Sequence, residues 1–168
     1  MAVATDLWET IAREAAQESR LWGDALRADP RREAVFSPLA EERFGLGLET
    51  IYEGYLLHYG RPRLFEPADA DAALLLGDYL YAHGLVRVAA ENEVEAVADL
   101  AALISLCAQL RADGASGDGE VWAATAALLG RGPLSGDREA AALADVAREA
   151  AGADALEHAL AVHAGRVS

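Results

Sequence analysis

The feature that most constrains this 168-residue sequence is a succession of helix-forming segments divided by proline and glycine. Apolar residues recur at spacings of three and four, as on one face of an α-helix, and no segment alternates polar and apolar residues as a half-buried strand does. Alanine supplies 39 residues, and it is the best helix former and a poor strand former. The pattern predicts a single all-α domain.

Capping residues and helix breakers predict where the helices lie. The first helix is expected over 5–28 and ends at Asp29-Pro30. Ser37-Pro38 is typical of an N-cap followed by proline at the first helical position, which predicts a second helix over 37–60. The segment 68–90 is the most apolar, so we expect it inside the bundle. Later helices are expected over 92–110, where 92–95 resembles a capping box, and over 120–129, 137–151 and 154–164.

We divide this single domain, 1–168, into three parts. Residues 1–36 form an N-terminal helix and connection, 37–112 carry the core helices, and 120–168 carry shorter C-terminal helices. The glycine-rich segment 113–120 lacks the carboxylate spacing of an EF-hand loop and the Gly-Lys-Ser/Thr of a P-loop. It is therefore interpreted as a connection between helices.

The charge balance restricts the partners. The sequence has 28 acidic residues against 14 basic ones, all of them arginine, for a net charge of −14. Nucleic acids and anionic membranes are bound by basic surfaces, so neither is expected as a partner. The lone Cys107 lies in an apolar run and is interpreted as a small core residue. No signal-peptide pattern begins the sequence and charge-free runs reach only about ten residues, which predicts a cytoplasmic protein without a membrane span.

One stretch, 49–110, resembles a known family. Residues 73–82 read ALLLGDYLYA and are similar to the LLAGDYLLARA helix of the trans-type polyprenyl diphosphate synthases, with Gly77, Asp78 and Tyr79 as the matching centre. Upstream, Gly60-Arg61-Pro62 lies where that family has an RRGRP segment. The resemblance implies an isoprenoid-synthase-like antiparallel helical bundle.

The departures from that family concern its catalytic motifs. Its first aspartate-rich motif, which holds magnesium, falls on Glu49 and Glu53, four residues apart on one helix face, with threonine at the middle position. No counterpart of the second aspartate-rich motif is found, and the sequence has no lysine for diphosphate binding. If diphosphate binding is retained, we expect Glu49 and Glu53 to hold Mg²⁺ and Arg61 and Arg63 to hold the phosphates. The alternative is that these four residues form an exposed helix end and the loop after it.

The losses favour a non-catalytic relative over an enzyme. The resemblance implies a small-subunit type: a regulatory or structural partner of a catalytic trans-prenyl diphosphate synthase, or an isoprenoid-binding homodimer. One alternative is a helical interaction module without a small-molecule ligand. Another is a small bundle enzyme that uses glutamate and histidine on a metal, although His158 and His163 are five residues apart, not the four that would place both on one helix face.

Overall fold

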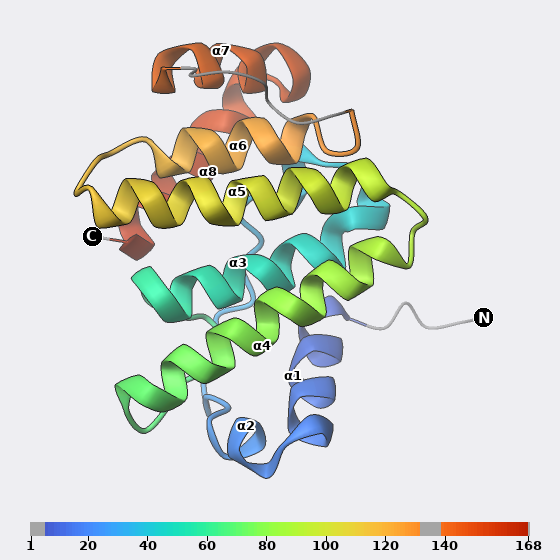
Figure 1. The fold of residues 1–168 in the computed structure, drawn as a ribbon, viewed down its shortest axis with the longest axis vertical. Coiled ribbons are helices and arrows are strands. Elements are labelled where there is room, and N and C mark those ends of the chain that lie inside the picture. The colour runs from blue at the N-terminus through green and yellow to red at the C-terminus, as the bar shows by residue number, and fades with distance from the viewer. Residues whose placement is uncertain (1–5, 132–138, 168) are drawn as a thin grey trace.

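The computed structural model describes residues 6–131 and 139–167. These residues are helical or in connections, and their one β-type pairing is an isolated bridge between Leu26 and Phe65. The prediction of an all-α protein is confirmed. The elements, labelled in Figure 1 where there is room, are α1 (Leu7–Glu18), α2 (Arg20–Asp24), the 3₁₀ turns η1 (Ser37–Leu39) and η2 (Glu42–Phe44), α3 (Gly45–Tyr59), α4 (Ala70–Ala89), α5 (Val94–Ala112), α6 (Asp118–Ala127), α7 (Ala140–Ala151) and α8 (Ala153–Val167).

Helix α3 is the centre of the molecule. With α4 it crosses the middle of Figure 1, with α1 and α2 on one side and α5 to α8 on the other. Twelve of its fifteen residues are buried. It contributes to both apolar clusters, the larger one with α5 to α8 and the smaller one with α1 and α4. The buried helix is thus α3 and not α4, which lies in the segment that we expected inside the bundle.

Helix α4 lies at the surface, which corrects the expectation for 68–90. Leu74, Leu75 and Val86 are 52%, 56% and 67% exposed. The buried face of α4 is carried by other residues, among them Leu76 and Leu80. The apolar residues of this helix therefore cover two faces, of which only one meets the core. The helix begins at Ala70, two residues after the predicted start, and the Asp69 side chain caps it by accepting a hydrogen bond from a backbone N–H of the first turn.

Glycines bring α3 and α4 together almost backbone to backbone. Gly47 lies against Gly84, and Gly54 against Gly77, so the two helices run in opposite directions. A Cβ on Gly54 would lie 2.9 Å from the Gly77 carbonyl oxygen, and one on Gly84 would lie 3.0 Å from the Gly47 oxygen. These distances are too short for a methyl group, so this contact requires residues without a side chain.

The N-terminal third departs from the predicted helices. The backbone of Ser19 is extended, with φ −151° and ψ 135°, so the predicted helix over 5–28 is broken into α1 and α2. The Ser19 hydroxyl accepts a hydrogen bond from Leu21 and starts α2 afresh. Ser37-Pro38 starts only the turn η1, and the long helix begins at Gly45.

The later connections also differ in detail. Asn92 has a φ of +60° and lies outside α5, so the capping box expected over 92–95 is wrong. The predicted helix over 137–151 corresponds to α7, and its first two residues, 137 and 138, lie outside the described residues. Cys107 is buried as predicted, and desolvation raises the pKa of its thiol to about 12. Within the described residues, no helix is long and apolar enough to cross a membrane.

Candidate functional site: an arginine-lined cleft

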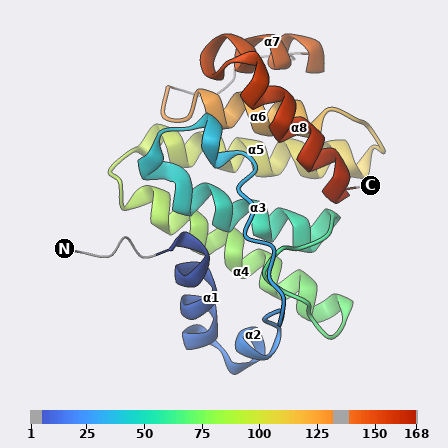
Figure 2. The same ribbon diagram turned by 180° about the vertical axis from the view of Figure 1, so that it is seen from behind.

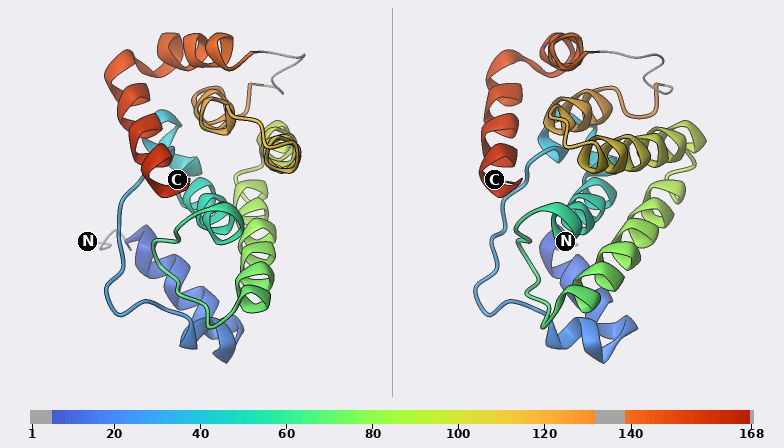
Figure 3. Two further views of the ribbon diagram at one scale, coloured as in Figure 1. Left: turned by 90° about the vertical axis from the view of Figure 1, so that its left-hand side faces the viewer. Right: turned by 60° about the vertical axis from the view of Figure 1, so that its left-hand side comes forward.

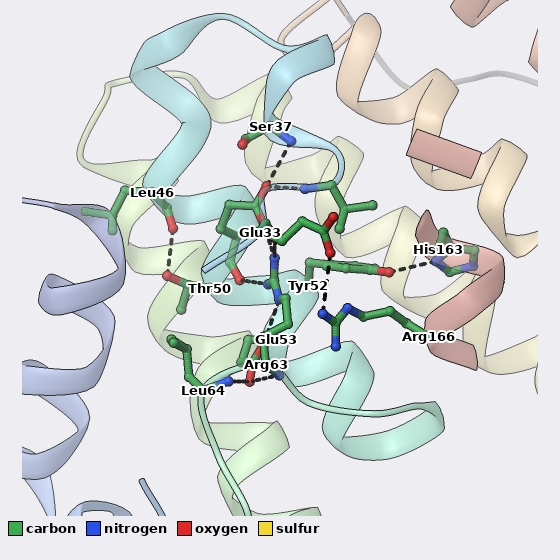
Figure 4. Close-up of polar contacts among 12 residues, drawn as sticks. Glu33, Ser37, Leu46, Thr50, Tyr52, Glu53, Arg63, Leu64, His163 and Arg166 are labelled. Carbon is green, nitrogen blue, oxygen red and sulfur yellow. Dashed lines mark hydrogen bonds and ion pairs between the residues drawn. The ribbon is translucent and has the colours of Figure 1, made fainter. Parts of the chain in front are cut away.

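A buried ion cluster fixes the loop after α3. Arg63 is fully buried between Glu49 and Glu53 of α3, and its guanidinium is 2.5 Å from one carboxylate and 3.0 Å from the other. In each carboxylate, the oxygen that does not face the Arg63 guanidinium accepts hydrogen bonds from backbone N–H groups. For Glu49 the donors are Val35 and Ser37. Glu53 accepts from the backbone of Arg63 itself and from the next residue. Figure 4 shows these contacts, which leave every carboxylate oxygen with at least one donor.

Aromatic rings complete the surroundings of Arg63. Its guanidinium lies 4.7 Å from the ring centre of Trp8 and 4.9 Å from that of Tyr52, both within the range of cation–π attraction. Burial alone would lower the pKa of this arginine, but the two carboxylates outweigh burial and raise it above its ordinary value. Arg63 is therefore a permanently charged structural residue.

The four residues expected to form one diphosphate site are divided between two places. Glu49, Glu53 and Arg63 form the buried ion cluster, where the arginine occupies the position between the carboxylates that the prediction gave to Mg²⁺. Their burial also corrects the alternative of an exposed helix end. Arg61, only two residues before Arg63, is exposed and lies at the mouth of a cleft outside this cluster.

The connection between α2 and η1 forms one wall of that cleft. Backbone hydrogen bonds hold it along the loop after α3: Arg27 donates to Leu64, and Arg31 donates to Arg63, each at 2.9 Å. Figure 2 shows this connection running along the back of the molecule beside α8. The pairing places the side chains of Arg27 and Arg31 on the same cleft as Arg61.

Helix α8 forms the other wall. The Arg61 N–H donates to the Arg166 carbonyl at 2.9 Å, and the Arg61 guanidinium donates to the Gly165 carbonyl. In return, Arg166 donates from Nη1 to the Arg61 carbonyl at 3.3 Å, while its Nη2 lies 3.5 Å from a carboxylate oxygen of Glu33. The buried Nε of Arg166 has no hydrogen-bond partner among the described residues. The left view of Figure 3 shows α8 against this connection.

Together these segments enclose an open cleft of about 600 Å³, within the range of small-molecule sites. Four guanidinium groups and one carboxylate line it, in a chain whose net charge is −14. Its lining residues are Arg27, Arg31, Glu33, Gly60, Arg61, Pro62, Ala161, Val162, Gly165 and Arg166. The cleft is therefore a local concentration of positive charge on an acidic protein.

The chemistry of this lining suits an oxyanion. A guanidinium presents several N–H donors in a planar fork that matches two oxygens of a carboxylate or phosphate. Among the described residues, no carboxylate is paired with the Arg31 side chain, and the Arg27 side chain is 3.9 Å from Glu66. Pro62, Ala161 and Val162 add uncharged surface between the arginines. An organic anion can thus satisfy the donors and cover the apolar part at once.

A second buried polar network holds α8 in place. His163 of α8 lies 2.9 Å from the Tyr52 hydroxyl and 3.0 Å from the carboxylate of Asp118, at the start of α6. Tyr55 and Arg111 also donate to this carboxylate. Burial opposes the charge of Asp118, but the bonds from these donors outweigh it and place the pKa of the carboxyl below its usual range. The cleft wall formed by α8 is therefore firmly anchored.

Of the remaining predicted residues, two take part in packing and one is exposed. Gly77 lies at the α3–α4 contact, Asp78 is exposed, and half-buried Tyr79 stacks on Trp22 with ring centres 6.1 Å apart. In the part of the chain that the structure describes, no group of three histidine, cysteine, aspartate or glutamate side chains is placed to hold a metal ion.

Sequence reasoning found Arg61 but missed Arg27, Arg31 and Arg166. These arginines come from segments up to 139 positions apart, 27 to 166, and no spacing within one helix connects them. The one available signal was that every basic residue is arginine in a strongly acidic chain. That signal does not say which arginines share a surface.

Comparisons of this chain with family models, with curated proteins and with solved structures yield no match.

Proposed function

We propose that this chain is a binding protein for a small organic phosphate, which it holds in the arginine-lined cleft without chemical turnover. The observation that carries the proposal is the gathering of four guanidinium groups on one cleft of about 600 Å³. A phosphate ester supplies about two negative charges at neutral pH and three acceptor oxygens. The described lining residues include no serine, cysteine, lysine, tyrosine or histidine that could act as a nucleophile.

Phenyl phosphate is a suitable probe, because its ring can lie on Val162 and Pro62 while its phosphate meets the arginines. We expect calorimetric titration to give saturable binding with one site. Arg31→Gln and Arg61→Gln should each weaken binding about tenfold. Arg148→Gln is the matched control, since this arginine lies on α7 and pairs with Asp145. Equal affinity in all four proteins would contradict the proposal.

A second proposal follows the resemblance to trans-type polyprenyl diphosphate synthases: a role as partner of a catalytic prenyl synthase, or as an isoprenoid-binding homodimer. The outer faces of α4 and α5 support a partner of some kind, because Leu74, Leu75, Val86 and Leu106 are exposed on them. Each of these residues is an apolar side chain that a second protein could cover.

Analytical ultracentrifugation tests this second proposal. The chain is measured alone and mixed with a trans-type prenyl synthase, with Val86→Glu as the variant and Glu42→Gln as a surface control. A complex or a homodimer that Val86→Glu disrupts would support a partner role. If the chain is a monomer both alone and in the mixture with the prenyl synthase, the interaction-module and partner-subunit hypotheses lose their support. Elemental analysis for a stoichiometric transition metal separates out the metal-enzyme alternative.

A further inference from the structure

The arginine-lined cleft contains one acidic side chain of its own. Glu33 lies on the connection between α2 and η1, and its carboxylate is 3.5 Å from Nη2 of Arg166. Figure 4 shows this carboxylate directed at the guanidinium of Arg166. Its side chain is 47% exposed, so it faces both the arginine and the solvent from which a ligand would arrive.

The backbone of Glu33 is held by the buried ion cluster. Its carbonyl accepts a hydrogen bond from Nη1 of Arg63 at 2.7 Å, and its N–H donates to the Arg31 carbonyl at 3.0 Å. Because Arg63 is fully buried and paired with two carboxylates, this anchor does not depend on the cleft being filled. The Glu33 carboxylate is thus tethered at the cleft even when it is not bonded to Arg166.

We infer that Glu33 is a built-in counter-anion of the cleft, which lowers the affinity for every anionic ligand and does so more strongly as the ligand charge increases. The inference rests on the proposed function. A ligand anion that approaches Arg166 meets the negative charge of Glu33 at short range, and Coulomb repulsion is proportional to the charge of the ligand. Glu33 therefore sets how strongly the cleft distinguishes dianions from monoanions.

The size of the effect follows from Coulomb's law. For charges about 6 Å apart in a water-like medium, one unit of ligand charge corresponds to about a threefold change in affinity. Removing the Glu33 charge should therefore strengthen binding of a monoanion about threefold and of a dianion about tenfold. The preference for the dianion should rise by about threefold.

The experiment compares two probes of the same shape class. Phenyl phosphate is a dianion at about pH 8, and benzenesulfonate is a monoanion. Both are titrated calorimetrically into the full chain, into Glu33→Gln and into Glu42→Gln at about 0.02 M salt, where screening is weak. Glu42→Gln removes one charge from an exposed position on η2, outside the cleft lining, so it controls for the change in net charge. Glu33→Gln keeps the backbone bond to Arg63.

The outcomes separate the two proposals. Stronger binding of both probes by Glu33→Gln, larger for phenyl phosphate, with Glu42→Gln within twofold of the parent protein, supports the inference. Equal changes for the two probes, or equal effects of the two substitutions, overturn it while binding itself persists. Absence of binding to the parent protein and to Glu33→Gln overturns the proposed function together with the inference.

Discussion

Arg61 and Arg63 are separated by one proline, yet they belong to opposite kinds of site. In the buried ion cluster one arginine meets two carboxylates and two aromatic rings, and no part of it reaches solvent. In the arginine-lined cleft four arginines and one carboxylate are among the described lining residues of an open space of about 600 Å³, and that carboxylate lies near Arg166 alone. The ratio of acid to arginine, more than the presence of arginine, separates a structural position from one that can take a ligand.

The difference is energetic as well as geometric. A buried charge without its partner costs several kcal/mol, whereas an exposed ion pair contributes about 0–1 kcal/mol. We therefore expect substitutions in the buried ion cluster to change stability and substitutions in the cleft to change binding of the proposed ligand. Substitutions can test this separation. A large loss of stability from a cleft variant, or a stability unaffected by a variant of the buried ion cluster, would contradict it.

The largest effect is expected from Arg63→Met. It leaves Glu49 and Glu53 buried without their cation, so the free energy of unfolding should fall by about 3–5 kcal/mol. Urea denaturation followed by circular dichroism measures the loss. Arg61→Met, two positions away, is the control and should change stability by less than about 1 kcal/mol. Similar losses in the two variants would show that the buried ion cluster has no special role.

The next effect concerns Asp118, whose network is partly buried and lies between the two extremes. Asp118→Asn should cost about 1.5–3 kcal/mol, since it weakens charge-assisted bonds from His163, Tyr55 and Arg111. The pKa of Asp118 is lowered in the folded protein. Its stabilising contribution is therefore fully present above the unfolded-state pKa of about 4 and is lost as the pH falls below it.

Urea midpoints measured from about pH 7 down to about pH 3 check this dependence. The parent protein should lose stability in the acid range, and Asp118→Asn should lose less of it. Parallel curves for the two proteins would mean that another carboxylate governs acid unfolding.

A smaller free-energy change is expected from Arg31→Glu, and it should appear in binding alone. Reversing this charge in the cleft should weaken phenyl phosphate binding by more than tenfold, or about 1.5 kcal/mol. The free energy of unfolding should change by less than about 1 kcal/mol, because the Arg31 side chain is exposed. A large loss of stability would place this arginine with Arg63 and remove the distinction.

Salt should give the smallest effect and apply to the cleft only. Raising the salt from about 0.05 M to 0.5 M screens exposed charges and should weaken phenyl phosphate binding several-fold. The stability difference between the parent protein and Arg63→Met should stay nearly constant, because both Arg63 and its carboxylates are shielded from ions. Equal salt dependence of the two quantities would contradict the assignment of one site as closed and the other as open.

Local signals predicted a helical chain and several of its helices, but not every helix boundary and not which helix is buried. The helix over 70–89 follows from the sequence to within two residues, because helix ends are decided largely by neighbouring residues such as Asp69. The break at Ser19 was missed although its hydroxyl caps α2 locally, whereas the burial of α3 depends on contacts with distant segments. Glu49 and Glu53 illustrate the same point: their spacing placed both on one face of α3, but the arginine that would occupy that face comes from the following loop.

The same reasoning explains the candidate site. Arg61 was found through the resemblance of its surroundings to a family motif, whereas Arg27, Arg31 and Arg166 share the cleft through backbone pairing and the docking of α8. Such convergence is a property of the folded chain. The sequence has 14 arginines in 168 residues, and too many sets of four can be chosen from them for the set that shares the cleft to be recognised from the sequence.

The glycine contacts between α3 and α4 have a consequence for how the fold selects its alignment. Gly47 and Gly54 are seven residues apart, as are Gly77 and Gly84, so the two helices carry matching intervals. Sliding one helix by a single turn would set a side chain against a backbone at both points. The matching intervals favour the observed register, and that register sets the distance that the connection between the two helices must span. The four glycines at the helix contact therefore help to set the span of the loop from which Arg61 points outward and Arg63 inward.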